Sequence, residues 1–206
     1  ILSRDTIPAS GVPSPGMPTV EYAGKTYNTI QIGTQCWLRE NLDVGTMILG
    51  VDTARNNGTI EKYCYDHDTN NCNIYGALYQ WNEAMQYTTA EGTKGICPNN
   101  WHIPTLGEFQ TLYTTVGGDG NSLKREDQGS GAGQGTNTTG FSALLAGNWN
   151  SDGYFDYLGD NAFFWSSTEY APADASSIYL DYSGSDVGLD YGAYNGRGFS
   201  VRCVKD

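Results

Sequence analysis

The chain carries little charge and few of the side chains on which most catalytic and nucleic-acid-binding sites depend. Of 206 residues only 17% are charged, and 11 lysines and arginines face 23 acidic residues, for a net charge of −12. So acidic a protein repels phosphate backbones and anionic lipids, and we expect no nucleic-acid partner. No stretch approaches the ~18 to 20 apolar residues that span a bilayer, so we expect no membrane insertion by this chain. Its first residues also lack the basic-then-apolar pattern of a signal peptide.

The familiar catalytic and metal-binding motifs are missing as well. Neither GxSxG nor HExxH occurs, and His102 directly precedes a helix start, where a hydrogen-bonded structural role is expected. We therefore expect neither an enzyme nor a cofactor. Acidic loops at Asp66, Asp68, Asp119 and 152–156 offer oxygen ligands for a structural calcium, although none forms a complete EF-hand loop.

The five cysteines contain no CxxC pair, which argues against a zinc ribbon or a redox motif and favours disulfides. A Cys64–Cys72 bridge would close a short polar loop. A Cys97–Cys203 bridge would tie the last strand to the middle of the chain. Cys36 is then left over, and we expect it to be a buried free thiol.

Abundant glycine (27) and tyrosine (15) favour short strands and ordered loops, and we predict an α+β fold rich in loops. Residues 1–18 carry four prolines and are predicted to form an extended linker, followed by one domain over 19–206. A hairpin is expected over 20–22 and 26–32. Further strands are expected over 163–166, 178–182, 187–191 and 199–204.

Two helices are predicted from the spacing of apolar residues. The first starts near residue 74 and uses positions 77, 78, 81, 84 and 85 as its buried face. The second begins after Thr105, which forms a capping box with Glu108 ahead of an apolar stripe. Glycine and small polar residues dominate 117–140, which predicts a long surface loop.

Seven segments together resemble the Fibrobacter succinogenes major paralogous domain: IGTQCWLRENL (32–42), CYDHDTNNC (64–72), YGALYQWNEAM (75–85), GICPNNWHIPT (95–105), GFSALLAG (140–147), FWSSTEY (164–170) and GFSVRCV (198–204). The resemblance implies a secreted or surface protein with a C-type-lectin-like fold, two helices packed on short antiparallel sheets with long loops. The five tryptophans lie in or near these segments, and we expect them to fill the core.

The chain also resembles the variable proteins of diversity-generating retroelements, in which AAY codons become NNY codons. Such codons never encode Lys, Glu, Gln, Met or Trp. Residues 170–198 contain none of these five types, whereas residues 1–169 contain 27 of them. A variable region at about 170–198 is one interpretation. The alternative is a polar edge that merely lacks long side chains.

This resemblance implies a receptor whose C-terminal surface binds a macromolecule, most simply a protein, at a cell or virion surface. Alternation over 185–190 buries Val187 and Leu189, and the same logic buries Ile178 and Leu180. Tyr, Ser, Gly and Asp, common in this segment, also dominate antibody paratopes. The predicted ligand-binding residues are Asp174, Ser176, Tyr179, Asp181, Tyr182, Ser183, Gly184, Asp186, Gly188, Asp190, Tyr191, Tyr194, Asn195 and Arg197, with Tyr182, Tyr191 and Tyr194 as anchors.

Two other functions stay open at this point. A cell-surface module that binds glycan or acts structurally is one, although the EPN, QPD and WND tripeptides of calcium-dependent sugar-binding lectins are missing. An enzyme of the formylglycine-generating type is the other, but its chemistry needs active-site cysteines and only Cys36 lacks a structural assignment. Arg202 and Glu169 are expected to form a structural ion pair or to bind loop backbone groups, with no ligand role.

Overall fold

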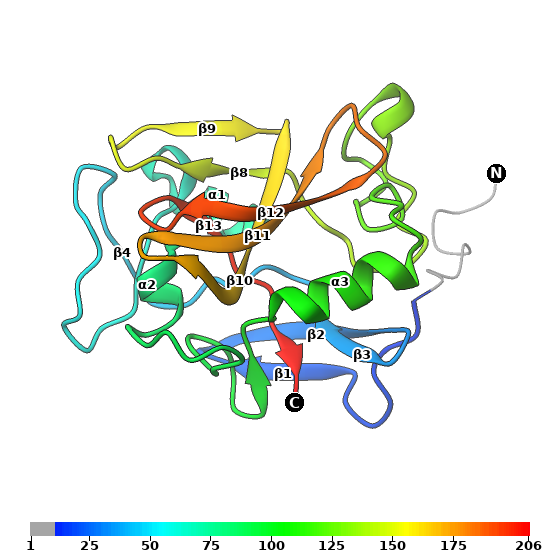
Figure 1. Cartoon of the computed structure of the whole chain (residues 1–206), viewed down its shortest axis with the longest axis horizontal. Coiled ribbons are helices and arrows are strands. Elements are labelled where there is room, and N and C mark those ends of the chain that lie inside the picture. Colours follow the sequence, from blue (N-terminus) through cyan, green and yellow to red (C-terminus); the bar gives the residue numbers. More distant parts are fainter. Residues whose placement is uncertain (1–10) are drawn as a thin grey trace.

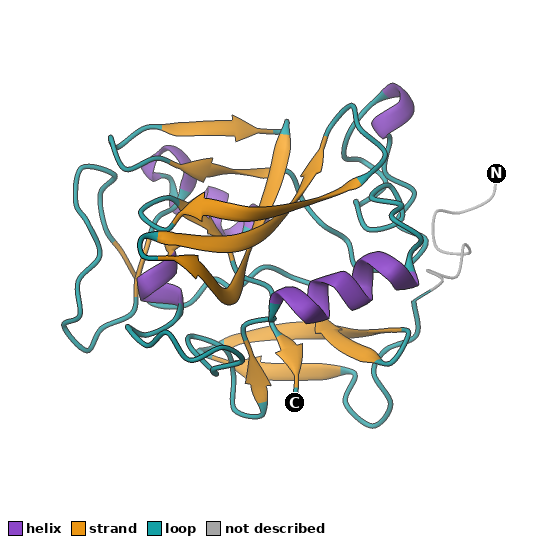
Figure 2. Cartoon of the chain, viewed as in Figure 1, coloured by secondary structure: helices purple, strands orange, loops and turns teal. Residues whose placement is uncertain are grey.

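A computed structural model describes residues 11–206 (Figure 1). Strands dominate, and they form two large curled sheets and one two-stranded sheet (Figure 2). Helices are few and short, and α3 (Leu106–Thr115) is the longest. The mixed class predicted from composition is confirmed. No helix in the described part of the chain is long and apolar enough to cross a membrane.

The first sheet brings the two ends of the domain together. Its strand order is β1-β2-β3-β14-β7, and the predicted opening hairpin is confirmed as β1 and β2 joined at Ala23 and Gly24. The last strand, β14, lies between β3 and β7. The bounds are β1 Thr19–Tyr22, β2 Lys25–Ile32, β3 Gln35–Leu38, β7 Trp101–His102 and β14 Val204–Lys205.

The segment just before β1 lies against β2. The Gln31 amide donates to the Val12 carbonyl at 2.8 Å, the Thr29 amide donates to the Pro18 carbonyl at 3.0 Å, and Ser14 is buried. The predicted linker covered residues 1–18, of which 1–10 lie outside the described residues. Residues 11–18 are therefore in contact with the domain.

The second sheet is mixed. Its order is β12-β11-β10-β13-β8-β9, and β6 also pairs with β13. β10 pairs antiparallel with β11 but parallel with β13 and β8, so the prediction of purely antiparallel sheets is wrong at its centre. The bounds are β6 Leu78–Gln80, β8 Ala146–Trp149, β9 Phe155–Leu158, β10 Asn161–Ala171, β11 Asp174–Asp181, β12 Val187–Tyr194 and β13 Gly198–Ser200; the short parallel pair is β4 Thr46–Met47 with β5 Glu61–Lys62.

Helix α3 begins where the capping box predicts. The Glu108 amide donates to the Thr105 hydroxyl at 3.1 Å, and the Thr105 amide donates to a Glu108 carboxylate oxygen at 2.8 Å. These two bonds satisfy amides that the first helical turn leaves free. The helix buries Phe109 and Leu112, and Phe109 stacks on Trp37 with ring centroids 5.5 Å apart. All five tryptophans are buried, which confirms their assignment to the core.

The helix predicted from residue 74 is wrong in its first half. Helix α1 (Thr69–Tyr75) ends at Gly76, whose φ of 81° suits glycine and breaks the helix. The next residues form strand β6, and a single helical turn, α2 (Trp81–Ala84), follows. All three β6 residues are buried, because β6 is covered on both faces. A fully buried strand shows no alternation, so its apolar residues imitate helical spacing.

The strand predicted over 199–204 divides into two. β13 belongs to the second sheet and β14 to the first, and 201–203 cross between them. Every residue from 198 to 204 is buried. The remaining short helices are η1 (Tyr65–His67) and η2 (Gly131–Gly133), the latter inside the predicted loop 117–140.

Both predicted disulfides are confirmed. Cys64 bonds to Cys72 across eight positions, and Cys97 bonds to Cys203 across 106. Cys36 is free and buried, as expected. The longer bridge joins the segment before β7 to the crossing that links the two sheets.

Removal of the two bridges should have unequal effects on stability. In the loop-entropy model the Cys97–Cys203 bridge contributes about 4 to 5 kcal/mol and the Cys64–Cys72 bridge about 2.5 kcal/mol. We expect the Cys97→Ala/Cys203→Ala variant to lose more free energy of unfolding than Cys64→Ala/Cys72→Ala, measured by denaturant unfolding. An equal or smaller loss for the longer bridge would contradict this assignment.

Candidate functional site

Exposed tyrosines gather on the hairpin of β11 and β12 and on its flanks. Tyr182, Tyr191 and Tyr194, the predicted anchors, are 42%, 45% and 48% exposed. Tyr179 on β11 is 39% exposed, and Tyr170 near the end of β10 is 64% exposed. Buried tyrosines in this protein fall to 2% or less, so these five side chains are available to a ligand.

The two strands bury one set of side chains and expose another. Ile178 pairs with Leu189 and Leu180 with Val187 on the face that packs against the core beneath α3. On the opposite face Tyr179 pairs with Gly188. The predicted burial of Ile178, Leu180 and Val187 is confirmed, and Leu189 is half-buried.

The prediction that Ser176 contacts a ligand is wrong. Ser176 is 1% exposed, so its side chain is not available at the surface where we predicted a ligand contact. Its neighbours Ala175 and Ser177 are also buried, because packed side chains cover both faces of β11 at this point. A register shift between Ala175 and Ser177 adds an extra residue to β12 opposite them. Neither feature is visible in the alternation of the sequence.

The turn of the hairpin rests on the 117–140 loop, which lies beside it in Figure 1. The Gly120 amide donates to the Ser185 carbonyl at 2.7 Å, and the Val187 amide donates to the Gly118 carbonyl at 3.0 Å. On the other side of the turn the Ser130 amide donates to the Tyr182 carbonyl at 2.8 Å. The predicted surface loop therefore holds the turn of the hairpin in place through backbone hydrogen bonds.

A buried lysine completes this support. The side chain of Lys124 is fully buried, and its ammonium donates to the carbonyls of Asp181 and Gly184 at 2.7 and 2.8 Å. Burial lowers the pKa of Lys124. The buried ammonium needs hydrogen-bond acceptors, and the two carbonyls satisfy it. These two bonds therefore fix the positions of the Asp181 and Gly184 carbonyls at the two ends of the turn.

Asp181 also acts within the turn. Its carboxylate accepts the Ser183 hydroxyl at 2.7 Å and the amides of Ser183 and Gly184 at 2.8 and 2.9 Å. The hydrogen bond from the Ser183 hydroxyl leads the contacts that lower the pKa of Asp181. Among the predicted ligand-binding residues, Asp181 therefore makes the most side-chain hydrogen bonds within the turn.

The other end of the hairpin lies against β6 and α2. The Trp81 amide donates to the Asn195 carbonyl at 3.1 Å, and the Gln80 side-chain amide donates to the Gly196 carbonyl at 3.1 Å. A cavity of about 180 Å³ opens here, and Tyr194 and Glu83 are among its lining residues. Glu83 is buried, no cation within residues 11–206 forms an ion pair with it, and burial raises its pKa.

Glycines lie directly beneath two of the exposed rings. A Cβ on Gly188 would come within 2.2 Å of the Tyr179 ring, and one on Gly196 within 2.5 Å of the Tyr194 ring. A cross-strand ring over a glycine fills the space that the missing side chain leaves. These glycines therefore leave room for the two rings, and a side chain at Gly188 would displace the Tyr179 ring.

The predicted residues thus lie along the hairpin from end to end and do not form one compact pocket. Tyr179, Tyr182, Ser183, Asp186, Tyr191, Tyr194 and Arg197 are exposed; Asp174, Asp181, Gly184, Gly188, Asp190 and Asn195 are half-buried; Ser176 is buried. We call the exposed seven, together with Tyr170, the hairpin surface.

Sequence reasoning missed the aromatic residues that extend this surface. Tyr170 was left out of the predicted set although it is the first residue of the segment that lacks Lys, Glu, Gln, Met and Trp. Tyr157 of β9 and Phe163 of β10 form a row of rings with Tyr179, each step 6.3 Å between centroids. Phe163 lies opposite Tyr179 in the pairing of β10 with β11, and Tyr157 joins the row through its contact with Phe163, so the row depends on strand pairing that the sequence alone does not show.

One of the two histidines, His102, lies between two carboxylates. His102 contacts a Glu108 carboxylate oxygen at 2.9 Å through Nε2 and Asp206 at 2.7 Å through Nδ1, and the Glu108 contact leads those that raise its pKa. It therefore joins β7 to the cap of α3. Within residues 11–206 no three His, Cys, Asp or Glu side chains gather in a group that could hold a metal ion.

Loss of the Lys124 charge should loosen the turn. We expect Lys124→Met, which keeps the side-chain length, to lower the free energy of unfolding by about 2 to 4 kcal/mol and to speed hydrogen exchange at Gly184 and Val187. Lys94→Met, at an exposed loop position, is the matched control and should change stability by less than about 0.5 kcal/mol. Unchanged exchange at Gly184 and Val187 in Lys124→Met would contradict the supporting role.

Comparison with known proteins gives one positive result. Residues 30–205 match the family model of the Fibrobacter succinogenes major domain. Searches of curated proteins and of solved structures found no match. The matched region begins within β2 and ends within β14, so it includes the second sheet and the whole hairpin, and of the first sheet it leaves out β1 and the first residues of β2. The chain therefore belongs to the Fibrobacter succinogenes major domain family.

Proposed function

We propose that this protein is a receptor-type variable protein of a diversity-generating retroelement, which presents a diversified C-terminal surface on a C-type-lectin-like scaffold. One observation carries the proposal. The segment 170–198, which lacks the five residue types that NNY codons cannot encode, supplies the hairpin surface. The flanking stretches 164–167 and 198–204 are wholly buried. The exposed tyrosines of this segment thus lie between two buried stretches of the scaffold.

The scaffold supports this function because the surface residues contribute little to the core. Ile178, Leu180 and Val187 point inward, and each fully buried aliphatic side chain stabilises by about 1.5 to 3 kcal/mol. Tyr182, Tyr191 and their exposed neighbours can change without removing that burial. A surface that tolerates replacement is what diversification requires.

The C-type-lectin-like fold belongs to the proposal as well. Its support is the pairing of the last strand, β14, with β3 of the opening sheet, and the packing of one capped helix on that core. Two disulfides favour an oxidising compartment, and we infer an extracellular place at a cell or virion surface.

The chemistry of the hairpin surface favours a protein as ligand. Tyrosine supplies a large amphipathic contact at a low entropic cost, while serine and glycine let the backbone adapt. Five exposed tyrosines spread along a whole hairpin suit an extended partner better than a small molecule.

The test is to sequence this gene and its flanks in related isolates. We expect variation at AAY-derived codons for exposed positions such as Tyr179, Tyr182 and Tyr191, with Ile178 and Leu180 unchanged. A reverse transcriptase gene and an invariant near-repeat of the 170–203 coding region should lie nearby. Uniform drift along the chain, without the near-repeat, would contradict the proposal and favour a cell-surface module that binds glycan or acts structurally.

A further inference from the structure

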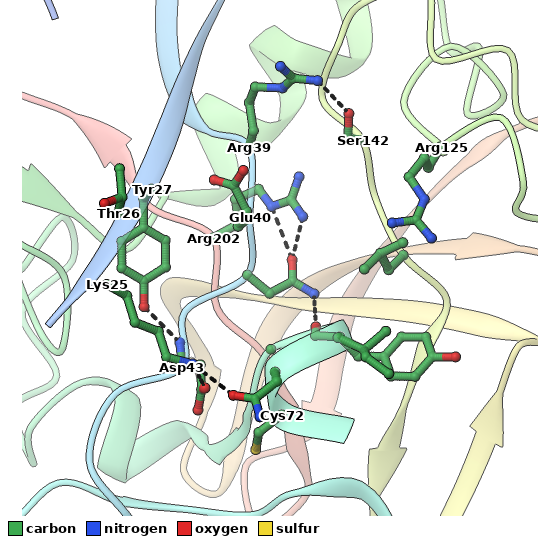
Figure 3. A pocket seen from close by; sticks show the side chains of 16 residues that line it. Lys25, Thr26, Tyr27, Arg39, Glu40, Asp43, Cys72, Arg125, Ser142 and Arg202 are labelled. Atoms are coloured by element: carbon green, nitrogen blue, oxygen red, sulfur yellow. Dashed lines mark hydrogen bonds and ion pairs between the residues drawn. The ribbon is translucent and has the colours of Figure 1, made fainter. Parts of the chain in front are cut away.

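A cavity between β2, the segment after β3 and the end of α1 gathers positive charge. Its volume is about 360 Å³, and its lining includes Lys25, Arg39, Arg125 and Arg202, four of the 11 lysines and arginines (Figure 3). Two carboxylates, Glu40 and Asp43, also line it. The protein has a net charge of −12, whereas the side chains that line this pocket carry more positive than negative charges.

Two of the four cations already have carboxylate partners. Asp43 pairs with Lys25 and also with Lys62. Arg125 forms a two-point pair with Asp127, at 2.6 and 2.7 Å. Arg39 and Arg202 remain, with Glu40 as the other carboxylate of the lining, so the two arginines leave a local excess of positive charge.

Arg202 is a buried charge with no ion pair among the described residues; burial lowers its pKa to about 9, and the charge of Glu40 opposes that shift. Arg202 is 1% exposed, and its guanidinium contacts the Asn41 side-chain oxygen, at 3.1 Å from Nε, and the Phe141 carbonyl. Of the two roles expected for Arg202 and Glu169, the ion pair is not formed, since Glu169 is exposed and no carboxylate within residues 11–206 lies within ion-pair distance of Arg202. The bond to the Phe141 carbonyl confirms the other role for Arg202, which binds loop backbone.

The surroundings of Arg202 hold its guanidinium in place but leave some of its N–H groups without a hydrogen-bond partner among the described residues. Its guanidinium carbon lies 4.4 Å from the centre of the Phe141 ring and 5.3 Å from that of Phe164. The hydrogen bonds to the Asn41 side chain and to the Phe141 carbonyl occupy three of its five N–H groups. A buried guanidinium without a carboxylate is costly, so a bound anion would stabilise it.

Arg39 is the more accessible partner. It is half-buried and donates to the Gly140 carbonyl at 3.0 Å and the Ser142 hydroxyl at 3.2 Å. No carboxylate in the part of the chain that the structure describes lies within ion-pair distance of it. In Figure 3 Arg39 and Arg202 reach the pocket from separate segments of the chain. Arg39 can contact an anion directly, with Arg202 supplying positive potential behind it.

The acidic side of the pocket narrows the class of ligand. Glu40 accepts two hydrogen bonds from Asn28, at 2.7 Å each, and keeps further lone pairs, as does Asp43. These negatively charged carboxylates repel a phosphate dianion, and they can accept hydrogen bonds from the hydroxyl groups of a ligand. The volume is at the lower end for small-molecule sites. We propose that this pocket binds a small hydroxylated monocarboxylate of the sugar-acid type, with its carboxylate at Arg39 and Arg202.

The proposal does not depend on diversification, because the pocket shares no lining residue with the hairpin surface. The probe is sodium glucuronate, titrated into the full chain by calorimetry, with glucose and inorganic phosphate in parallel. We expect saturable binding of glucuronate that weakens as salt rises, and weaker binding of both other compounds.

Substitution of Arg39 tests the assignment of residues. We expect Arg39→Gln to weaken glucuronate binding about ten-fold or more and Arg39→Lys to restore part of it. Arg55→Gln, an exposed arginine outside this pocket, is the matched control and should leave binding unchanged. Thermal unfolding of each variant confirms that the fold is intact.

Four results would overturn the proposal. They are no saturable glucuronate binding, equal affinity for glucose, equal or tighter binding of phosphate, and full affinity in a folded Arg39→Gln protein. The third would identify a general anion site. None of these results would alter the expected variation on the hairpin surface, so failure here is distinguishable from failure of the proposed function.

Discussion

The buried crossing of residues 198–204 between the two sheets is the constraint on which the rest of the structure depends. Phe199 stacks on Trp165 at 4.2 Å between centroids, Cys203 is bonded to Cys97, and β14 then enters the first sheet between β3 and β7. Because this segment is buried on all sides, it fixes both sheets relative to one another. Any variable surface has to end where β13 begins.

In the hairpin that precedes the crossing, the side chains that stabilise the fold differ from those that we propose contact a ligand. Its inward side chains complete two core clusters, one on each face of the sheet, while the turn is held by the 117–140 loop and Lys124. What remains outside is a set of tyrosines and small polar residues. Their positions are set by backbone contacts and by the glycines beneath them, and not by side-chain packing with each other.

Local signals in the sequence predicted the parts that depend on local physics. The capping box at Thr105 located α3, and the cysteine spacing gave both disulfides. Alternation predicted the inward face of the hairpin but failed for β6 and Ser176, because strands covered on both faces carry no alternating pattern. The cationic pocket was not predicted, since it joins segments more than 150 residues apart, and only the fold brings Arg39 and Arg202 together.

The central claim is that the scaffold folds independently of the side chains it displays. The most direct measurement compares two NNY-codon libraries on a display system, scored by protease resistance. One varies Tyr179, Tyr182, Tyr191 and Tyr194, and the other varies Ala175, Ile178, Leu180 and Ala193. The account predicts that most variants of the exposed set stay folded and most variants of the buried set do not. Equal loss of folded protein in the two libraries would contradict it.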